Sequence, residues 1–347
     1  MEEKGVEVEK VLEELESRLS LDMNYRSGRI LGSMCTIPHP LARKIVSKYL
    51  EKNLGDPGLF PQTFQIEREV IKMLGSLFGN PEASGIIVSG GTEANITAMR
   101  IARNMSRRLG RNGREVIVPE SAHASFDKAA DILDLKLVKA NLDEEYRVNV
   151  DDVQSKISKN TIAIVGVAGT TALGTVDPIE ALSDISEDKN LYLHVDAAFG
   201  GFVLPFLERM GIEIPRFDFR VEGVSSITVD PHKMGMAPIP AGGILLRDVK
   251  MFKDNSFEIP YLAGGKYEHP IILGTRSGAT VIATWALLKH LGIEGYIKIV
   301  RKCMQVTHII ERGIEEIEGL RTPVKPLMNI VGISSEMIDI CQLDLEL

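Results

Sequence analysis

Seven short apolar runs alternate with segments of helical hydrophobic spacing from about residue 66 onward. Short β-rich runs separated by helical patterns are typical of a mostly parallel sheet that helices cover on both faces. The chain is therefore predicted to form an α/β fold around a seven-stranded sheet. The predicted strands are Gly85–Ser89, Glu115–Val118, Lys136–Lys139, Ile162–Val167, Leu191–Val195, Ser226–Val229 and Gly243–Leu246.

The two ends of the chain show different patterns. Apolar positions at helical spacing predict an amphipathic helix over the first 20 residues, whereas residues 22–65 are rich in Gly, Pro and Asn and contain one helix near Pro40–Lys52. A long helix is predicted from about Thr284. We expect three parts: an N-terminal helix and dimer-wrapping segment over 1–65, a large domain over 66–283 and a small domain over 284–347.

Composition and charge exclude several classes of partner. The 347 residues carry a net charge of −8, which argues against a nucleic-acid or anionic-membrane partner. No apolar run approaches the roughly 20 residues needed to span a bilayer. Cys35, Cys303 and Cys341 lack metal-site spacing, which indicates a reducing compartment and no metal. Because the acidic N-terminus is unlike a signal peptide, we expect a cytoplasmic protein.

The first candidate site is Ser89–Asn95, which follows an apolar run and opens a helix. Gly90 and Gly91 allow the backbone to approach a ligand closely, and a helix N-terminus presents unpaired N–H groups and the positive end of the helix dipole. This arrangement suits a phosphate group. The alternative is an ordinary glycine turn with Thr92 as the helix N-cap.

Two further motifs follow predicted strands. In His194–Gly200, the Asp196 carboxylate can hold a proton on the nitrogen of a heteroaromatic ring, and the small Ala198 leaves room for that ring. In Asp230–Gly235, an apolar setting would remove water from the Lys233 amine and favour the neutral form that makes an imine. The alternatives are a helix-capping aspartate and a solvated surface lysine.

His123 follows the run that ends at Val118, where its imidazole can stack on a ring, although a lone histidine is more often structural. In parallel sheets, ligands bind beyond the carboxyl ends of the strands. An anion site, a stacking ring, a carboxylate and an imine-forming lysine at one sheet edge are the parts that pyridoxal 5′-phosphate (PLP) requires. The sequence therefore predicts a PLP site.

The same motifs resemble those of the fold-type I PLP enzymes, specifically the group II amino-acid decarboxylases and, within them, the archaeal L-tyrosine/L-aspartate decarboxylases. The resemblance extends to about residue 335. It implies the PLP-dependent transferase fold of type I, decarboxylation of an L-amino acid, and a homodimer with active sites at the subunit interface. The matching motifs are Asn53–Gly58, Ser89–Asn95, His194–Gly200, Asp230–Lys233 and Gly274–Gly278.

The resemblance also implies roles for single residues. Lys233 forms the imine with the cofactor, Asp196 pairs with the pyridine nitrogen, and His123 and Ala198 lie against opposite faces of the ring. The residues implied near the phosphate or the ring hydroxyl are Gly91, Thr92, Thr171, Asp230 and His232.

Other implied residues concern catalysis by a loop and the partner subunit. In the family, a mobile loop after the lysine carries a tyrosine that protonates the product. Tyr267 falls at the matching place, one residue closer to the glycine-arginine motif than in some relatives, and Tyr261 is the reserve candidate. Gly274 and Thr275 are implied to reach the phosphate bound by the partner subunit.

The substrate and the reaction stay open at this point. The resemblance implies conversion of L-tyrosine to tyramine, for methanofuran synthesis, or of L-aspartate to β-alanine, for coenzyme A synthesis. Retro-aldol cleavage is an alternative, as is sulfur transfer, which Cys303 in a helical stretch fits poorly. Another alternative is a protein that binds PLP but turns substrate over poorly. Relatives carry a late arginine that helps to hold the substrate carboxylate, but here no arginine follows Arg321, and the ending Cys341–Leu347 suggests an incomplete small domain. Arg276 could hold the carboxylate instead.

Overall fold

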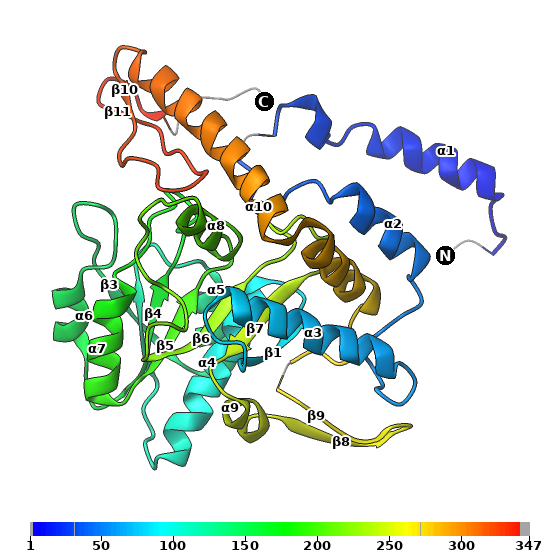
Figure 1. The fold of residues 1–347 in the computed structure, drawn as a ribbon, viewed down its shortest axis with the longest axis horizontal. Coiled ribbons are helices and arrows are strands. Elements are labelled where there is room, and N and C mark those ends of the chain that lie inside the picture. Colours follow the sequence, from blue (N-terminus) through cyan, green and yellow to red (C-terminus); the bar gives the residue numbers. More distant parts are fainter. Residues whose placement is uncertain (1–2, 31, 271, 341–347) are drawn as a thin grey trace.

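The computed structural model describes residues 3–30, 32–270 and 272–340. Its centre is a seven-stranded sheet in the order β1-β7-β6-β5-β4-β2-β3, in which β7 runs antiparallel to both of its neighbours and the other pairs are parallel (Figure 1). Each predicted run overlaps one strand, so the predicted α/β fold is confirmed. The strands are β1 (Ser84–Val88), β2 (Glu115–Pro119), β3 (Lys136–Ala140), β4 (Thr161–Val167), β5 (Tyr192–Asp196), β6 (Val224–Val229) and β7 (Gly242–Leu246).

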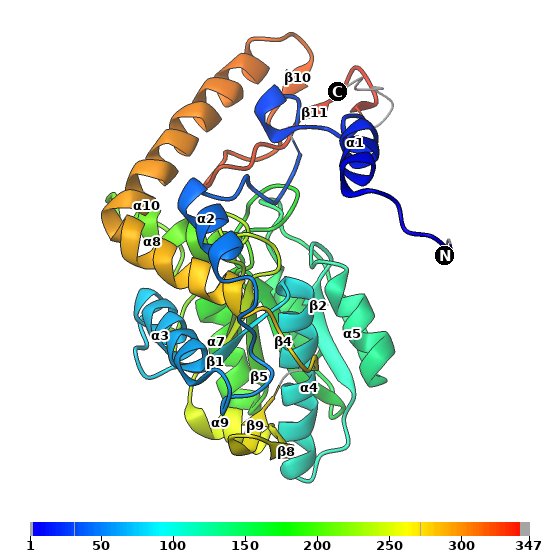
Figure 2. The ribbon, with the colours of Figure 1, turned by 90° about the vertical axis from the view of Figure 1, so that its right-hand side faces the viewer.

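Helices cover both faces of this sheet (Figure 2). They are α3 (Pro61–Leu77), α4 (Gly91–Arg108), α5 (Ser125–Leu133), α6 (Val150–Lys156), α7 (Ile179–Lys189), η2 (Gly200–Phe202), α8 (Leu204–Arg209) and α9 (Val249–Asp254). Strand side chains alternate between two cores. On β7, Ile244 and Leu246 pack with α4 and α5, whereas Leu245 packs in a larger core with α3, α7 and α8.

The long helix predicted from Thr284 is α10 (Gly278–Glu315). It begins earlier than predicted because the Ser277 hydroxyl accepts a hydrogen bond from the Thr280 N–H and caps its first turn. The helix is interrupted at Gly292, whose φ of 54° is unfavourable for residues with a side chain.

The small C-terminal part contains one two-stranded sheet, formed by β10 (Leu320–Arg321) and β11 (Ser334–Ser335). The closing residues 341–347, on which the expectation of an incomplete small domain depends, lie outside the described residues. The division of the chain into three parts stays a prediction.

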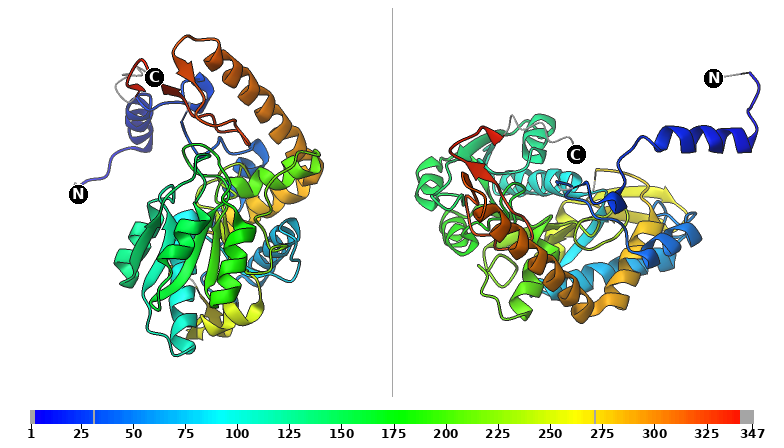
Figure 3. Two further views of the ribbon diagram at one scale, coloured as in Figure 1. Left: turned by 90° about the vertical axis from the view of Figure 1, so that its left-hand side faces the viewer. Right: turned by 90° about the horizontal axis from the view of Figure 1, so that it is seen from above.

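The N-terminal part contains α1 (Val8–Leu19), η1 (Tyr25–Ser27) and α2 (Pro40–Lys48). The amphipathic helix predicted over the first 20 residues is confirmed by α1, but none of its residues is buried, and α1 projects away from the body of the molecule (Figure 3). By contrast, α2 packs along α10. An uncovered apolar stripe therefore remains on α1, made of Val8, Val11, Leu12, Leu15 and Leu19.

A hairpin of β8 (Phe257–Leu262) and β9 (Gly265–His269) connects α9 with α10, and no apolar run indicated it. Charged residues such as Glu258 and Lys266, which form an ion pair, are interspersed through it and disguise the strand pattern. The hairpin lies apart from the seven-stranded sheet (Figure 1).

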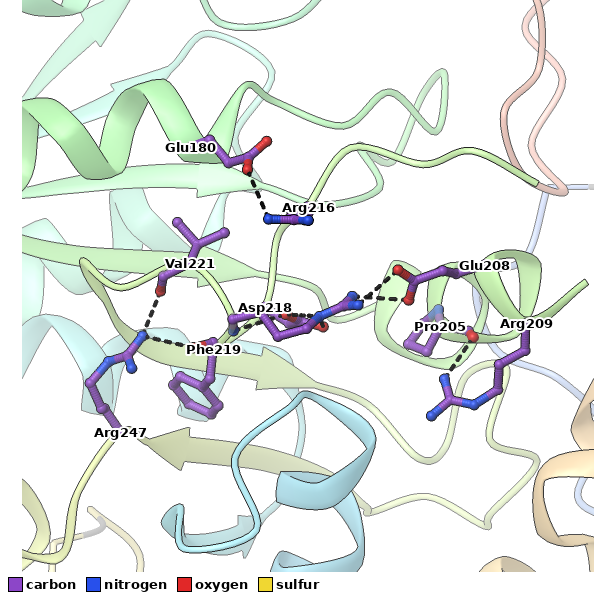
Figure 4. A network of polar contacts seen from close by, with 10 residues as sticks. Glu180, Pro205, Glu208, Arg209, Arg216, Asp218, Phe219, Val221 and Arg247 are labelled. Atoms are coloured by element: carbon purple, nitrogen blue, oxygen red, sulfur yellow. Dashed lines mark hydrogen bonds and ion pairs between the residues drawn. The ribbon is translucent and has the colours of Figure 1, made fainter. Parts of the chain in front are cut away.

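A polar network fixes the segment that leads into β6 (Figure 4). The buried Asp218 carboxylate accepts hydrogen bonds from the backbone N and the Nε of Arg220 at 3.1 and 2.9 Å. Arg220 also pairs with Glu208 on α8. Arg247, which follows β7, donates to the carbonyl of Val221. These bonds hold the start of β6 against α8 and the end of β7. They therefore fix the position of β6 and of the residues that follow it.

Two findings concern the expected cellular location. Cys35 and Cys303 are free, half-buried cysteines, whereas Cys341 lies outside the described residues. Of the helices in the described part of the chain, none is long and apolar enough to cross a membrane. The cytoplasmic location stays a prediction.

Candidate active site

A cavity of about 350 Å³ opens at the carboxyl edge of the sheet. The structure brings together there all the predicted site residues except Tyr267, Gly274 and Thr275. These residues end or follow five different strands, as expected for the ligand-binding edge of a parallel sheet. The lining residues are Ser89, Gly90, Gly91, Thr92, Asn95, Ser121, His123, Val167, Gly169, Thr171, Asp196, Ala198, Phe199, Asp230, His232 and Lys233.

One wall of the cavity is the turn between β1 and α4. Gly90 is the N-cap and α4 begins at Gly91, so the alternative that Thr92 caps the helix is wrong. A Cβ atom at Gly91 would lie 2.9 Å from Asp230 Oδ2 and 3.3 Å from Ala198 Cβ, too close for an ordinary side chain. Glycine therefore brings the helix N-terminus, with its unpaired N–H groups, directly to the cavity, where an anion binds favourably.

Asp196 ends β5 and is buried. Its Oδ2 accepts a hydrogen bond from Asn95 Nδ2 at 2.8 Å, and its Oδ1 accepts one from the Ala198 N–H at 3.1 Å. The second bond is local, so Asp196 does resemble a capping aspartate, but its carboxylate also lines the cavity. Two donors fix its orientation there.

Lys233 lies in the turn after β6, and its Nζ is 3.3 Å from Asp230 Oδ2. Met234 beside it is buried, which agrees with the expected apolar setting, and the buried Asp230 carboxylate is a further neighbour. Burial raises the pKa of Asp230, against the opposing charge of Lys233. Thr36, from the N-terminal segment, donates to the Lys233 carbonyl at 2.7 Å and holds the turn in place.

Asp230 has a further free acceptor. Its Oδ1 is buried and has no hydrogen-bond partner among the described residues. A buried carboxylate oxygen without a donor is costly, so it marks a position that a donor group of a ligand can satisfy. This observation favours a ligand in the cavity.

Two histidines complete the walls. His232 Nδ1 accepts a hydrogen bond from the Ala241 N–H at 3.3 Å, and burial lowers the pKa of His232. His123 is exposed and its Nδ1 accepts from the Ser125 N–H at 3.1 Å, which fixes the ring at the cavity mouth. Thr171 lines the wall on the side of β4.

The two candidate tyrosines do not reach this cavity. Tyr267 on β9 packs edge-on against Phe64 with ring centroids 5.1 Å apart, and burial raises its pKa to about 12. Tyr261 on β8 is 83% exposed. Within one subunit, neither hydroxyl lies where a product could be protonated.

Gly274 and Thr275 are exposed and lie outside the main cavity, where Thr275 lines a smaller one of about 140 Å³. Arg276 does not line the main cavity: its buried guanidinium pairs with Glu67 and donates to the Ile87 carbonyl. Its charge is therefore paired within the subunit, and the alternative that Arg276 holds the substrate carboxylate stays a prediction.

Sequence reasoning missed a buried polar group behind Asp196. It consists of Asn95, Ser125, His194, Ser226 and Thr228, all almost fully buried. A signal was present, because His194 and Asp196 alternate along β5 and face Ser226 and Thr228 on β6. Polar residues at alternate positions of two paired, otherwise apolar strands point to a common buried network.

A mostly parallel sheet with an amine, a carboxylate and a helix N-terminus at its carboxyl edge is the arrangement of the PLP-dependent enzymes of fold type I. The family model described as "Pyridoxal-dependent decarboxylase conserved domain" matches residues 34–334. The chain belongs to this family and is a PLP-dependent carboxy-lyase.

Known proteins that are similar to this chain support the assignment to this family. The L-aspartate decarboxylase of Thermococcus kodakarensis is 52% identical over 337 residues, which cover 97% of this chain and 87% of that protein. A probable L-tyrosine/L-aspartate decarboxylase of Methanothermobacter thermautotrophicus is 55% identical over 312 residues, covering 90% and 84%. The solved sphingosine-1-phosphate lyase of Burkholderia pseudomallei superposes with a TM-score of 0.91 at 32% identity, covering 98% and 81%.

The residues that line the cavity fit PLP, because they include an amine, a carboxylate, a helix N-terminus and a buried acceptor without a donor. When bound, PLP supplies an electron sink for the bond that is cleaved at the substrate Cα. The α4 N-terminus would hold the phosphate, Lys233 would hold the cofactor covalently, Asp196 would accept the ring N–H, and His123 would lie over the ring. Each of these residues already lines the cavity.

Substitution of Lys233 tests the covalent assignment. The wild-type protein is expected to be yellow and to carry borohydride-fixed cofactor on the peptide that contains Lys233, because its amine lines the cavity. Lys233→Ala should carry none, by peptide mass spectrometry, whereas the surface variant Lys189→Ala should label normally. Label on another lysine of the wild-type protein would contradict the assignment.

Substitution of Asp196 tests the electrostatic role. Asp196→Asn keeps the shape of the side chain but removes the charge that holds the ring proton. Turnover at saturating PLP should fall by at least ~10²-fold, as when another preorganised electrostatic partner is removed. Asp184→Asn, on the exposed side of α7, is the control. A near wild-type rate for Asp196→Asn would refute the role.

Proposed function

We propose that the chain decarboxylates L-aspartate to β-alanine, L-tyrosine to tyramine, or both. The observation that carries the proposal is the convergence of Lys233, Asp196 and the α4 N-terminus on one cavity. Aspartate occurs in the names of both decarboxylases compared above, and tyrosine in one. The products would supply coenzyme A synthesis and methanofuran synthesis, respectively.

A retro-aldol lyase is the second candidate, because the solved lyase superposes closely. The cavity speaks against it. Its apolar lining residues are Val167, Ala198 and Phe199, and the other lining residues are polar or glycine. A long-chain amine would need an apolar route. Sulfur transfer is disfavoured too, because burial raises the pKa of the Cys303 thiol and Cys303 does not line the cavity.

The substrate assignment is tested by incubating the PLP-loaded protein separately with L-aspartate, L-tyrosine and L-glutamate and separating the products by mass. We expect β-alanine, tyramine or both, with Lys233→Ala as the blank. A sphingosine-1-phosphate arm covers the lyase alternative. An aldehyde in that arm without amines in the others would overturn the proposal. Binding of PLP with no product in any arm would favour the alternative of impaired turnover.

We further propose that the active enzyme is a homodimer with shared sites. Among the described residues that line the cavity, Lys233 is the only lysine or arginine. Because Lys233 is assigned to the cofactor, a substrate carboxylate needs a cation from elsewhere. Tyr267, Gly274 and Thr275, which family resemblance places at a site, lie away from the cavity of their own subunit. Together with the uncovered stripe of α1, these observations favour a partner that is wrapped by the N-terminal part.

Mixed dimers test this sharing of sites. Lys233→Ala and Tyr267→Phe should each be nearly inactive alone. If each site takes its tyrosine from the partner, subunit exchange in an equal mixture should restore about a quarter of wild-type activity, because half of the dimers gain one intact site. Light scattering should report a dimer. A monomer with bound cofactor, or no restored activity after verified exchange, would contradict the proposal.

A further inference from the structure

Asn95, in the second turn of α4, is the centre of the buried polar group behind Asp196. Its Nδ2 donates to Asp196 Oδ2 at 2.8 Å and to Ser125 Oγ at 2.9 Å. Its Oδ1 accepts from Thr228 Oγ at 2.7 Å and contacts His194 Nε2 at 3.0 Å. All four hydrogen-bonding positions of the amide are therefore used, which fixes the side chain completely.

The direction of these bonds is determined by Asp196. An ionised carboxylate only accepts, so the amide must turn its N–H group toward Asp196 and its carbonyl toward His194. A flipped amide would place two acceptor oxygens 2.8 Å apart in a buried site. His194 Nε2 must then carry the proton.

The other side of the His194 ring agrees with this tautomer. Its Nδ1 lies 2.7 Å from Ser226 Oγ and can accept that hydroxyl proton. Burial lowers the pKa of His194 to about 4, so the ring is neutral near neutral pH. A neutral ring has one donor and one acceptor, which matches the carbonyl of Asn95 on one side and the hydroxyl of Ser226 on the other.

We propose that Asn95 is a positioning residue that holds Asp196 as a fixed acceptor for the ring N–H of PLP, and that neutral His194 stabilises this orientation by donating to the Asn95 carbonyl. The hydrogen bonds of this network fix the orientation of each side chain in turn, and no proton has to move through them. Without the Asn95 N–H group, the carboxylate keeps only its bond to the Ala198 backbone and can rotate away from the cofactor. Fixed geometry is what makes such a partner effective.

The test is a double-mutant cycle with Asn95→Ala and Asp196→Asn. Asn95→Ala should lower kcat by ~10-fold or more, change KM for the substrate less, weaken PLP binding, and move the visible spectrum of bound PLP toward that of Asp196→Asn. Because Asn95 acts through Asp196, the double variant should be no slower than Asp196→Asn alone. A residue with a merely structural role would show additive losses.

Thr97→Val is the matched control. Thr97 lies on the same helix, is fully buried, and its hydroxyl has no hydrogen-bond partner among the described residues. This nearly isosteric change should leave the kcat and the spectrum unaltered. If both Thr97→Val and Asn95→Ala shift the spectrum equally, general packing of α4 is responsible and the proposal is wrong.

Two further variants keep the test independent of folding. Asn95→Asp places a second carboxylate against Asp196, and since two buried carboxylates so close cannot both ionise, its PLP affinity and spectrum should change more than those of Asn95→Ala. Ser226→Ala removes only the outer end of the network and should lower kcat by a smaller factor, about threefold. The inference rests on the PLP chemistry of the site, so its spectra stay informative even if the substrate is another amino acid. Unchanged spectra in both variants, or full additivity in the cycle, would overturn it.

Discussion

The burial of the Asp196 carboxylate at the end of β5 is the constraint on which the site depends. A charge removed from water is very unfavourable unless donors replace the water, and here they come from the backbone at Ala198 and from Asn95. Asn95 can donate because α4, which begins just after β1, packs against β5 and β6. The strand order, in which β5 and β6 are neighbours, brings Ser226 and Thr228 to the same place.

A second buried carboxylate, Asp230, gives the site its other half. It lies within 3.3 Å of Lys233 Nζ and 3.7 Å of His232 Nε2, and Asp196 raises its pKa further. The backbone at Gly91 passes beside Asp230, where no larger residue fits, and its helix adds positive potential. Space therefore requires a glycine at this position.

Sequence patterns predicted the sheet well because each strand is a short apolar run. Alternate side chains of these strands pack into the two cores on either side of the sheet. The site residues at the strand ends could be predicted because parallel strands end at one edge. Contacts between distant segments could not be. Arg276 pairs with Glu67, which lies 209 positions away, and nothing in either local motif indicates that bond. The β8–β9 hairpin was missed because charged residues interrupt its pattern. Asn95 was missed because its partners lie on two other strands and on α5.

The ion pair between Arg276 and Glu67 also connects the cavity with the segment around Gly274, which lies outside it. Glu67 binds both Arg276 and the Ile87 N–H of β1, just before the glycine turn. Glu93, in the first turn of α4, accepts from the Ser89 N–H at 2.8 Å and from the Leu273 N–H at 3.4 Å. The turn beside the cavity and the exposed segment at Gly274 thus share two buried carboxylates. Because the same two carboxylates bond to the turn and to the segment around Gly274, the hydrogen bonds that hold the anion-binding turn also hold the residues that the proposed dimer would offer to its partner.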